Sequence, residues 1–255
     1  MSEPKGRVDL DRTRERLVDL GLEHAAEQLA AILSEAVKEE LPAHRFLDLV
    51  LDAEHDRREE RRVKTSLRLS GLPVGQTIGN FDFGFQPEIP RGLVETLATC
   101  AWIREHETVL IQGPPGIGKT HLAVALGVRA VENGFSAVFY RLDDLLHALK
   151  RDADSPPSKL RGKKYMNASL LIIDEVGFQP MTRQEASLFF RMVSYRYGRG
   201  AMLITTNKAV KDWPEILAGD EAMATALLDR LLHRCHVLSI KGRSYRLRDL
   251  ERRLA

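Results

Sequence analysis

The sequence predicts an α/β core built on a parallel sheet, preceded by a small all-α region. Two patterns indicate this: short apolar runs alternate with helical stretches from residue 91 onward, and apolar residues recur at helical spacing upstream. Such alternation is typical of a parallel sheet with helices on both faces, where ligands bind beyond the carboxyl ends of the strands. With 255 residues, 44% of them hydrophobic, the chain can bury one core of ordinary size plus a smaller attachment.

Residues 1–69 are expected to form the helical domain. Pro42 separates its two helical runs, the second of which begins near Ala43. The first run has these apolar residues at helical spacing: Leu22, Ala25, Leu29, Ile32, Leu33 and Ala36. Residues 70–90 change to Gly, Pro and aromatic residues, which indicates a linker. Its Phe81, Phe83 and Phe85 need a packing surface, so we expect it to lie against the domain formed by residues 91–255.

Five apolar runs in that domain predict strands at 108–112, 137–140, 170–173, 201–205 and 236–240. The polar segment 151–164 contains two prolines and is expected to be an exposed loop.

A phosphate-binding motif, GPPGIGKT, follows the first predicted strand and precedes a predicted helix. Its glycines let backbone N–H groups turn toward phosphate oxygens, Lys119 reaches the β- and γ-phosphates, and the Thr120 hydroxyl ligates magnesium. A chance Gly-rich turn is the alternative, but it would not need the flanking strand and helix. The predicted nucleotide-binding residues are Gly113, Pro114, Pro115, Gly116, Ile117, Gly118, Lys119, Thr120 and the adjoining His121, the last in a supporting role.

Two carboxylates, Asp174 and Glu175, end the apolar run LLII. Asp174 is expected to hold magnesium together with Thr120, and Glu175 to orient and activate the attacking water. The alternative is a solvated strand end, although a buried strand seldom needs two acids there.

Two later residues complete the candidate catalytic set. Asn207 follows the next predicted strand, so its amide would lie beside the γ-phosphate; the alternative is an ordinary turn residue. Arg230 lies in the amphipathic segment ALLDRLLHR. It either pairs with Asp229 in its own chain or neutralises developing phosphate charge at a neighbouring subunit.

With these motifs in place, the chain resembles the IstB-like helpers of insertion-sequence transposition, a branch of AAA+ proteins grouped with DnaC-type helicase loaders. The resemblance extends over nearly the whole chain, through GPPGIGKTHLAVALG, LLIIDEVGFQP, ITTN, LLDRLLHRC and KGRSYRLR. Upstream, EHDRREERRVKTSLRLSGLP followed by NFDF is similar to the stretch that precedes the ATPase core in such helpers.

The resemblance implies roles for single residues. Lys119 and Thr120 match Walker A, Asp174 and Glu175 match Walker B, and Asn207 matches sensor 1. Arg230 matches the arginine finger and Arg246 a sensor 2-like arginine. Because the chain ends soon after Arg246, we expect no C-terminal helical lid, as in the IstB/DnaC branch.

The resemblance also implies an activity. An ATPase that uses ATP and Mg²⁺ would assemble into an oligomer on double-stranded DNA and assist a separate transposase in target selection. Two alternatives stay open: a loader whose main partner is a replicative helicase ring, and a nucleotide switch with weak turnover.

A basic helical face independently favours DNA binding. Arg57, Arg61, Lys64 and Arg68 follow helical spacing, with Arg58 and Arg62 beside them. The acids Asp56, Glu59 and Glu60 are expected on the opposite side. Such a face neutralises phosphates without reading sequence. A solvated helix with many ion pairs is the alternative.

Composition excludes several other classes. The net charge of +2 does not by itself indicate an anionic partner, and two cysteines without a CxxC pair predict neither a disulfide framework nor a zinc site. The charged N-terminus lacks an apolar run, so we expect a cytoplasmic protein without a signal peptide or membrane partner.

Overall fold

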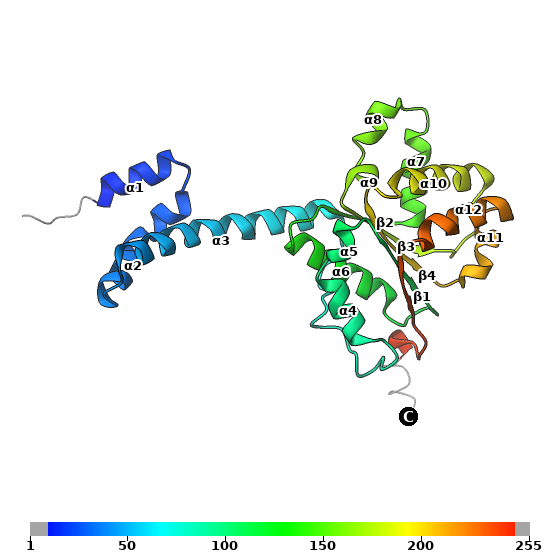
Figure 1. Ribbon diagram of the computed structural model, residues 1–255, viewed down its shortest axis with the longest axis horizontal. Helices are drawn as coiled ribbons and strands as arrows, with labels where there is room; N and C mark the ends of the chain where they lie inside the picture. The colour runs from blue at the N-terminus through cyan, green and yellow to red at the C-terminus, as the bar shows by residue number, and fades with distance from the viewer. Residues whose placement is uncertain (1–9, 248–255) are drawn as a thin grey trace, which may run out of the picture. The chain divides into compact units, whose positions relative to one another are not determined.

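The computed structural model describes residues 10–247, apart from the side chains of Pro157 and Arg246. Two compact units divide the chain (Figure 1): an N-terminal unit, Met1–Thr65, and a core unit, Ser66–Ala255. The division falls inside one long helix, whereas the sequence led us to expect a linker at 70–90. Each unit is described by itself.

Three helices account for the N-terminal unit: α1 (Leu10–Asp19), α2 (Glu23–Lys38) and α3 (Ala43–Ser70), whose last residues enter the core unit. Pro42 lies between α2 and α3, as expected. Ala25, Leu29 and Val50 form a small buried cluster, against which Ile32 and Phe46 pack half-buried. Of the six apolar residues identified by helical spacing in the sequence, Leu22, Ala25, Leu29 and Ile32 belong to this cluster or pack on it, whereas Leu33 and Ala36 do not.

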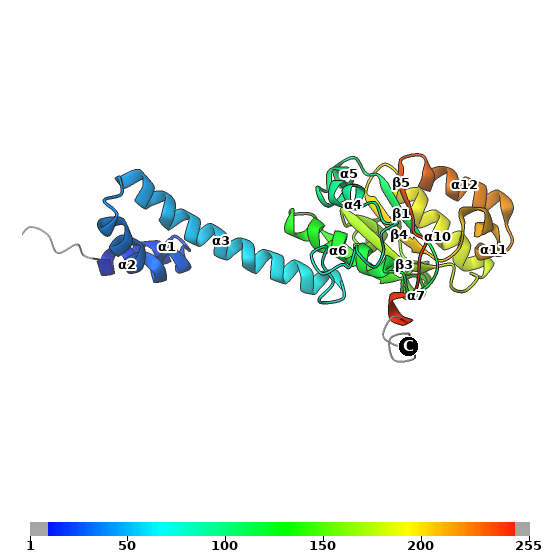
Figure 2. The same cartoon turned by 90° about the horizontal axis from the view of Figure 1, so that it is seen from below.

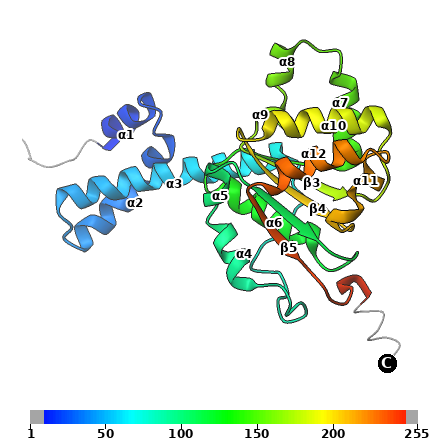
Figure 3. The ribbon, with the colours of Figure 1, turned by 45° about the vertical axis from the view of Figure 1, so that its right-hand side comes forward.

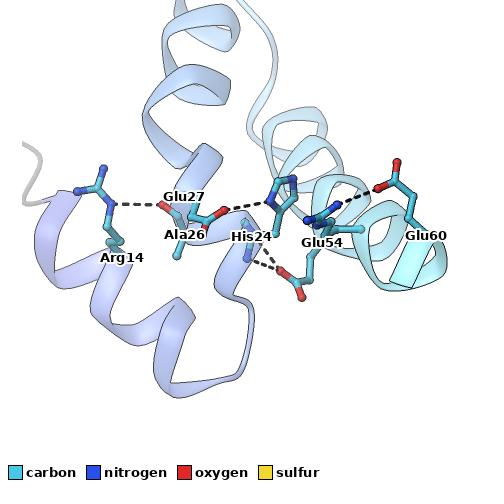
Figure 4. A network of polar contacts seen from close by, with 8 residues as sticks. Arg14, His24, Ala26, Glu27, Glu54 and Glu60 are labelled. Carbon is cyan, nitrogen blue, oxygen red and sulfur yellow. Dashed lines mark hydrogen bonds and ion pairs between the residues drawn. The ribbon is translucent and has the colours of Figure 1, made fainter. Parts of the chain in front are cut away.

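A buried carboxylate joins α2 to α3 (Figure 4). Glu54 of α3 is 6% exposed and accepts hydrogen bonds from the backbone N–H groups of His24 and Ala25, at 2.9 and 3.1 Å. These N–H groups belong to the first turn of α2, which has no partner for them within the helix. Arg58 Nε donates to the same carboxylate at 2.8 Å. Burial raises the pKa of Glu54, but these hydrogen bonds outweigh it and hold the pKa below its usual value.

A five-stranded parallel sheet of order β2-β3-β4-β1-β5 forms the centre of the core unit (Figure 3). The strands are β1 (Thr108–Gln112), β2 (Ala137–Arg141), β3 (Leu170–Val176), β4 (Ala201–Thr206) and β5 (Cys235–Ser239). The predicted α/β fold class is therefore confirmed, and each predicted strand is present with its ends shifted by at most three residues. Because the strands are parallel, their carboxyl ends meet at one edge of the sheet.

Helices cover both faces of this sheet (Figures 2 and 3). On one face α6 packs so closely that a Cβ at Gly127 would lie 2.6 Å from Ile172 Cδ1. On the other face α7, α10 and α12 bury Leu171 and Ile204 in a large apolar cluster. The helices are α4 (Arg91–Ala98), α5 (Ala101–Arg104), α6 (Lys119–Glu132), α7 (Leu142–Asp152), α8 (Pro157–Arg161), α9 (Lys164–Asn167), α10 (Arg183–Arg196), α11 (Trp213–Ile216) and α12 (Glu221–Leu232), with 3-10 turns η1 (Val210–Asp212) and η2 (Tyr245–Leu247).

The expectation that residues 151–164 form a loop was wrong, although most of them are exposed as expected. Helix α7 continues to Asp152, and two short helices, α8 and α9, follow. The Asp152 side chain is buried and accepts hydrogen bonds from Lys163 Nζ and the Tyr165 hydroxyl, each at 2.9 Å. The sequence did not predict this contact, because a buried acid with two hydrogen-bond partners cannot be distinguished by its residue type from an exposed acid.

No helix among residues 10–247 is long and apolar enough to span a membrane.

Candidate nucleotide-binding site

The GPPGIGKT segment is a loop between β1 and α6 at the carboxyl edge of the sheet. Gly113 N–H donates to the Thr206 carbonyl of β4 at 3.1 Å. Gly113, Gly116 and Gly118 have positive φ angles of 153°, 81° and 97°. A Cβ on Gly118 would lie 2.7 Å from Phe81 Cε2, so this path requires glycine. The loop leads into the N-terminus of α6, whose free N–H groups favour a phosphate.

Lys119 and Thr120, the first residues of α6, contact different partners. Lys119 Nζ donates to the carbonyl oxygens of Gly113 and Pro114, both at 2.8 Å. Thr120 Oγ1 lies 3.0 Å from each carboxylate oxygen of Asp174, which is 1% exposed near the end of β3. The ammonium therefore lies over the loop, and a hydroxyl from α6 meets a carboxylate from β3.

The Thr120 and Asp174 pair fits magnesium. Both offer hard oxygen ligands, which Mg²⁺ prefers, and both lie beside the phosphate-binding loop. In the part of the chain that the structure describes, no group of three or more His, Cys, Asp and Glu side chains could hold a metal ion.

Glu175 has a backbone conformation that separates its carboxylate from that of Asp174. Its φ is +63°, and the β3–β4 ladder is irregular between Ile173 and Val176. The Glu175 N–H donates to Thr205 Oγ1 at 3.0 Å, and the Thr205 hydroxyl donates to Asp174. A left-handed non-glycine residue is uncommon and is kept only where its surroundings hold it. As a result Asp174 is buried at Thr120, while Glu175 is exposed.

Two contacts at this edge of the sheet had not been identified from the sequence. Arg141, the last residue of β2, places Nε 3.9 Å from Glu175 Oε2, and the two side chains are 66% and 49% exposed. Thr205 connects β4 to both acids. Arg141 ends β2 and Thr205 is the last residue but one of β4, and both strands neighbour β3. The sequence places both residues near strand ends, but it does not show which strands are neighbours.

One cleft of about 560 Å³ brings together the predicted catalytic and metal-binding residues of the core unit, except Arg230. Lys119, Thr120, Asp174, Glu175 and Asn207 all line it, from α6 and from the ends of β3 and β4. Residues 115–118 and His121 line it as well, whereas Gly113 and Pro114 do not and instead contact Lys119.

The segment before α4 forms one wall of this cleft. His121 Nε2 lies 2.9 Å from the Thr77 carbonyl and 3.0 Å from Asn80 Oδ1, and its ring packs edge-to-face on Phe81 at 5.2 Å. Phe83 packs on Phe81, and Phe85 packs on Tyr245. The expectation that these phenylalanines pack on the following domain is confirmed. His121 holds this wall in place, which is a supporting contact.

The chain also returns to the loop near its C-terminal end. The Tyr245 N–H donates to the Gly116 carbonyl at 2.8 Å, and the buried Gln86 donates to the Arg243 carbonyl at 2.8 Å. Segments far apart in sequence therefore hold the phosphate-binding loop from both sides. Gly116 belongs to the phosphate-binding motif, and Arg243 and Tyr245 belong to the KGRSYRLR segment, but no sequence pattern predicted that these two segments are in contact.

The predicted arginine finger, Arg230, is not part of this cleft. Arg230 donates to the Ala226 carbonyl at 2.6 Å, and its guanidinium lies 5.0 Å from the centroid of the Phe190 ring. Arg230 does not line the cleft of its own chain and forms no ion pair with Asp229 among the described residues. The side chain of Arg246 lies outside what the structure describes.

The basic face of α3 is more mixed than the sequence suggested. Arg57 pairs with Glu60 at 3.1 Å, so Glu60 is not on the opposite side of the helix. Arg62 likewise pairs with Glu59 at 2.8 Å, and Arg58 with Glu54. The predicted segregation of acids was wrong for Glu59 and Glu60, since residues three apart are neighbours on a helix. Within residues 10–247, Arg61, Lys64 and Arg68 are exposed and form no ion pair.

Comparison with known proteins identifies clear relatives. The IstB-like ATP binding protein family matches residues 15–253. The insertion sequence IS21 putative ATP-binding protein of Pseudomonas aeruginosa is 42% identical over 230 residues, which cover 90% of this chain and 86% of that protein. The IS5376 putative ATP-binding protein of Geobacillus stearothermophilus is 36% identical over 94% of this chain and 95% of its own length.

Solved structures show the same fold. The DnaC helicase loader has a TM-score of 0.50 and 23% identity over 59% of this chain and 88% of its own. The replication initiator DnaA, bound to AMPPCP and single-stranded DNA, has a TM-score of 0.56 and 19% identity over 72% of this chain and 56% of its own. These neighbours confirm the AAA+ fold class predicted from the motifs.

Proposed function

Because this chain belongs to the IstB-like ATP binding protein family, we propose that it is a magnesium-dependent ATPase that assembles on double-stranded DNA and assists a separate transposase in target selection. The observation that carries the proposal is the convergence of Lys119, Thr120, Asp174, Glu175 and Asn207 on one cleft. The parallel sheet brings these strand ends and the helix N-terminus to one edge, but packing alone does not require a lysine, two acids and an amide there, whereas phosphoryl transfer does.

The chemistry follows from these positions. Lys119 and the N-terminus of α6 neutralise the phosphate oxygens of ATP, and Thr120 and Asp174 hold magnesium, which supplies further positive charge there. Glu175, exposed in the cleft, accepts the proton of the attacking water. The Asn207 amide orients that water or the γ-phosphate.

Arg230 acts on a neighbouring subunit in this proposal. Two observations support it: the side chain does not line the cleft of its own chain, and no acid pairs with it among the described residues. An arginine supplied by another subunit stabilises the charge that develops in phosphoryl transfer. Hydrolysis therefore requires self-association, and ATP and DNA control it by controlling assembly.

DNA binding is assigned to the exposed cations of α3. Arg61, Lys64 and Arg68 carry most of it, because no acid pairs with them within the described chain. Arg57, Arg58 and Arg62 contribute less, since each already pairs with a glutamate. Binding by such a face does not depend on base sequence. The free cysteines Cys100 and Cys235 suit a reducing cytoplasm, where we place the protein.

A second candidate is a replicative-helicase loader, which the fold similarity to DnaC favours. Both candidates use the same ATPase cleft, so nucleotide assays do not separate them. Co-sedimentation does: the leading proposal predicts association with the transposase of the same insertion sequence and none with a replicative helicase ring. The reverse result would support the loader.

Subunit mixing tests the shared active site. Arg230→Ala subunits and Glu175→Gln subunits should each have low turnover on DNA, and mixtures should regain part of it where an intact Glu175 faces an intact Arg230. Native mass spectrometry must show co-assembly. Co-assembly without recovery at any ratio would place Arg230 in a structural role, and a protein that binds ATP without turning it over would be a nucleotide switch.

A further inference from the structure

A second hollow of the core unit lies apart from the nucleotide cleft. It has a volume of about 440 Å³, is lined by residues from the end of α7 and from α8, α9 and α10, and shares no lining residue with the cleft. Figure 1 labels these four helices. We name it the α7–α10 groove. Its walls are mainly apolar and include Leu149, Leu160, Met166, Leu188, Phe190 and Met192.

The rim of this groove is basic. Arg161 and Arg191 line it, are exposed, and form no ion pair among the residues that the structure describes. Residues 150–166 carry six Lys or Arg, of which Arg161 lines the groove, while Lys150 pairs with Glu185 at 2.6 Å and Lys163 with Asp152 at 2.9 Å. The same residues include two Asp. One of the two, Asp152, is buried against Lys163 and Tyr165, so its charge is already compensated. The other, Asp154, does not line the groove. The groove therefore combines an apolar interior with an uncompensated positive rim.

We propose that the α7–α10 groove docks a short segment of a partner protein in which a large apolar side chain is flanked by Asp or Glu residues. The apolar interior gains free energy by covering such a side chain, and the flanking carboxylates meet Arg161 and Arg191. Met166 and Met192 in the wall allow side chains of different shape to fit. Duplex DNA fits less well, because phosphates would use the two arginines and leave the apolar walls uncovered.

A segment bound in the groove would contact the Phe190 ring, on which the Arg230 guanidinium packs. Phe190 lines the groove, and the Arg230 guanidinium packs over the same ring at 5.0 Å. A bound segment that turns Phe190 therefore shifts Arg230, so docking changes the turnover of assemblies. This coupling rests on the proposed function, whereas docking itself does not.

Selection from a displayed library of random 12-residue peptides, with the full-length protein as target, tests the docking. The expected pool is enriched in sequences that combine Asp or Glu with Leu, Phe, Trp or Met. Fluorescence anisotropy of the selected peptides should then show binding that weakens as salt rises. The double variant R161E/R191E should weaken it at least about tenfold, and Leu160→Ser about fivefold, as expected for lost charge and apolar contacts.

A matched control makes the same change of charge away from the groove. Arg183 lies on α10 and Lys211 in η1; both are exposed and neither lines the groove. The variant R183E/K211E should keep peptide affinity within about twofold, since it keeps every groove contact. Thermal melts establish that both double variants fold.

Four results would overturn the proposal. A pool that is not enriched, or is enriched in neutral or basic peptides, would contradict the stated partner chemistry. If the selected peptides bound R161E/R191E and R183E/K211E with equal affinity, their binding site would not be the α7–α10 groove. Loss of duplex DNA binding in R161E/R191E alone would make the groove rim a nucleic-acid surface. A change of oligomeric state in that variant alone would make it a contact between copies. Peptide binding is measured without ATP hydrolysis. A failure of the docking proposal can therefore be distinguished from a failure of the ATPase proposal.

Discussion

In the core unit, residues far apart in sequence converge on one cleft, whereas the cations of α3 lie along a single helix. Lys119, Asp174 and Asn207 meet only because three elements end at the same edge of the sheet. Arg61, Lys64 and Arg68 need only a helix to share a surface. Residues that converge on one site act together, so replacing any one of them should reduce ATP binding or hydrolysis strongly. Residues spread along a helix contribute separately, so replacing any one of them should reduce DNA affinity only slightly.

The largest effect is expected at Glu175. Glu175→Gln keeps the shape of the side chain but removes the base, so hydrolysis should fall about a thousandfold, within the usual range for general base catalysis. ATP affinity should not change, because Lys119 and Thr120 are intact. Single-turnover hydrolysis and fluorescent-nucleotide binding measure the two quantities. Glu105→Gln, on the exposed surface, is the control, and near-normal turnover in Glu175→Gln would remove Glu175 from the catalytic set.

The substitution Lys119→Ala should weaken the binding of ATP. Loss of the ammonium removes a charge-assisted contact to phosphate and should weaken ATP affinity about a hundredfold. Isothermal titration calorimetry measures it. Arg129→Ala, near the other end of α6, is a control that should bind ATP normally. If a folded Lys119→Ala protein bound ATP as tightly as the unmodified chain, the cleft would not be the nucleotide site.

Glu54 offers the matching test of the N-terminal unit. Glu54→Gln weakens hydrogen bonds to the N-terminus of α2 and to Arg58 and should lower the free energy of unfolding of this unit by about 2 kcal/mol. Because the folded pKa lies below 4.5, this stabilisation is complete above that pH and is lost as pH falls through the folded pKa. Urea unfolding followed by circular dichroism at several pH values measures it.

The control for this prediction is Glu60→Gln, at an exposed ion pair, which should change stability by less than about 1 kcal/mol. Equal effects of the two substitutions would mean that Glu54 is no more than a surface residue.

The sequence was sufficient for features that depend on nearby residues. The GPPGIGKT motif and the strand that ends in Asp174 are continuous segments, so spacing alone placed them at the sheet edge. The contacts of Thr205 and Arg141 depend on which strands are neighbours, and the strand order β2-β3-β4 is a property of the whole fold. Sequence patterns do not carry that order.

The errors had the same origin. Residues 151–164 looked like a loop because they are mostly polar and include two prolines, but Asp152 is buried against Lys163 and against Tyr165 of α9. On α3, the acids were placed opposite the arginines by inspection of the pattern, although a three-residue step brings Glu60 next to Arg57. In both cases the prediction missed an ion pair, Lys163–Asp152 in the first and Arg57–Glu60 in the second.

The smallest effects per residue are expected on α3, and they divide its six cations into two sets. Replacing Arg61, Lys64 and Arg68 by Gln removes charges that no acid of the described chain compensates, so affinity for duplexes of unrelated sequence should fall equally. The slope of log affinity against log salt should flatten by about one unit per lost phosphate contact. Replacing Arg57, Arg58 and Arg62 removes charges already paired with glutamates, so the slope should change less. Fluorescence anisotropy across a salt series, with ATP binding as the control, measures both triple variants. If the paired set changed the slope as much as the unpaired set, the ion pairs would have to open on DNA, and if neither set changed it, α3 would not be the DNA-binding face.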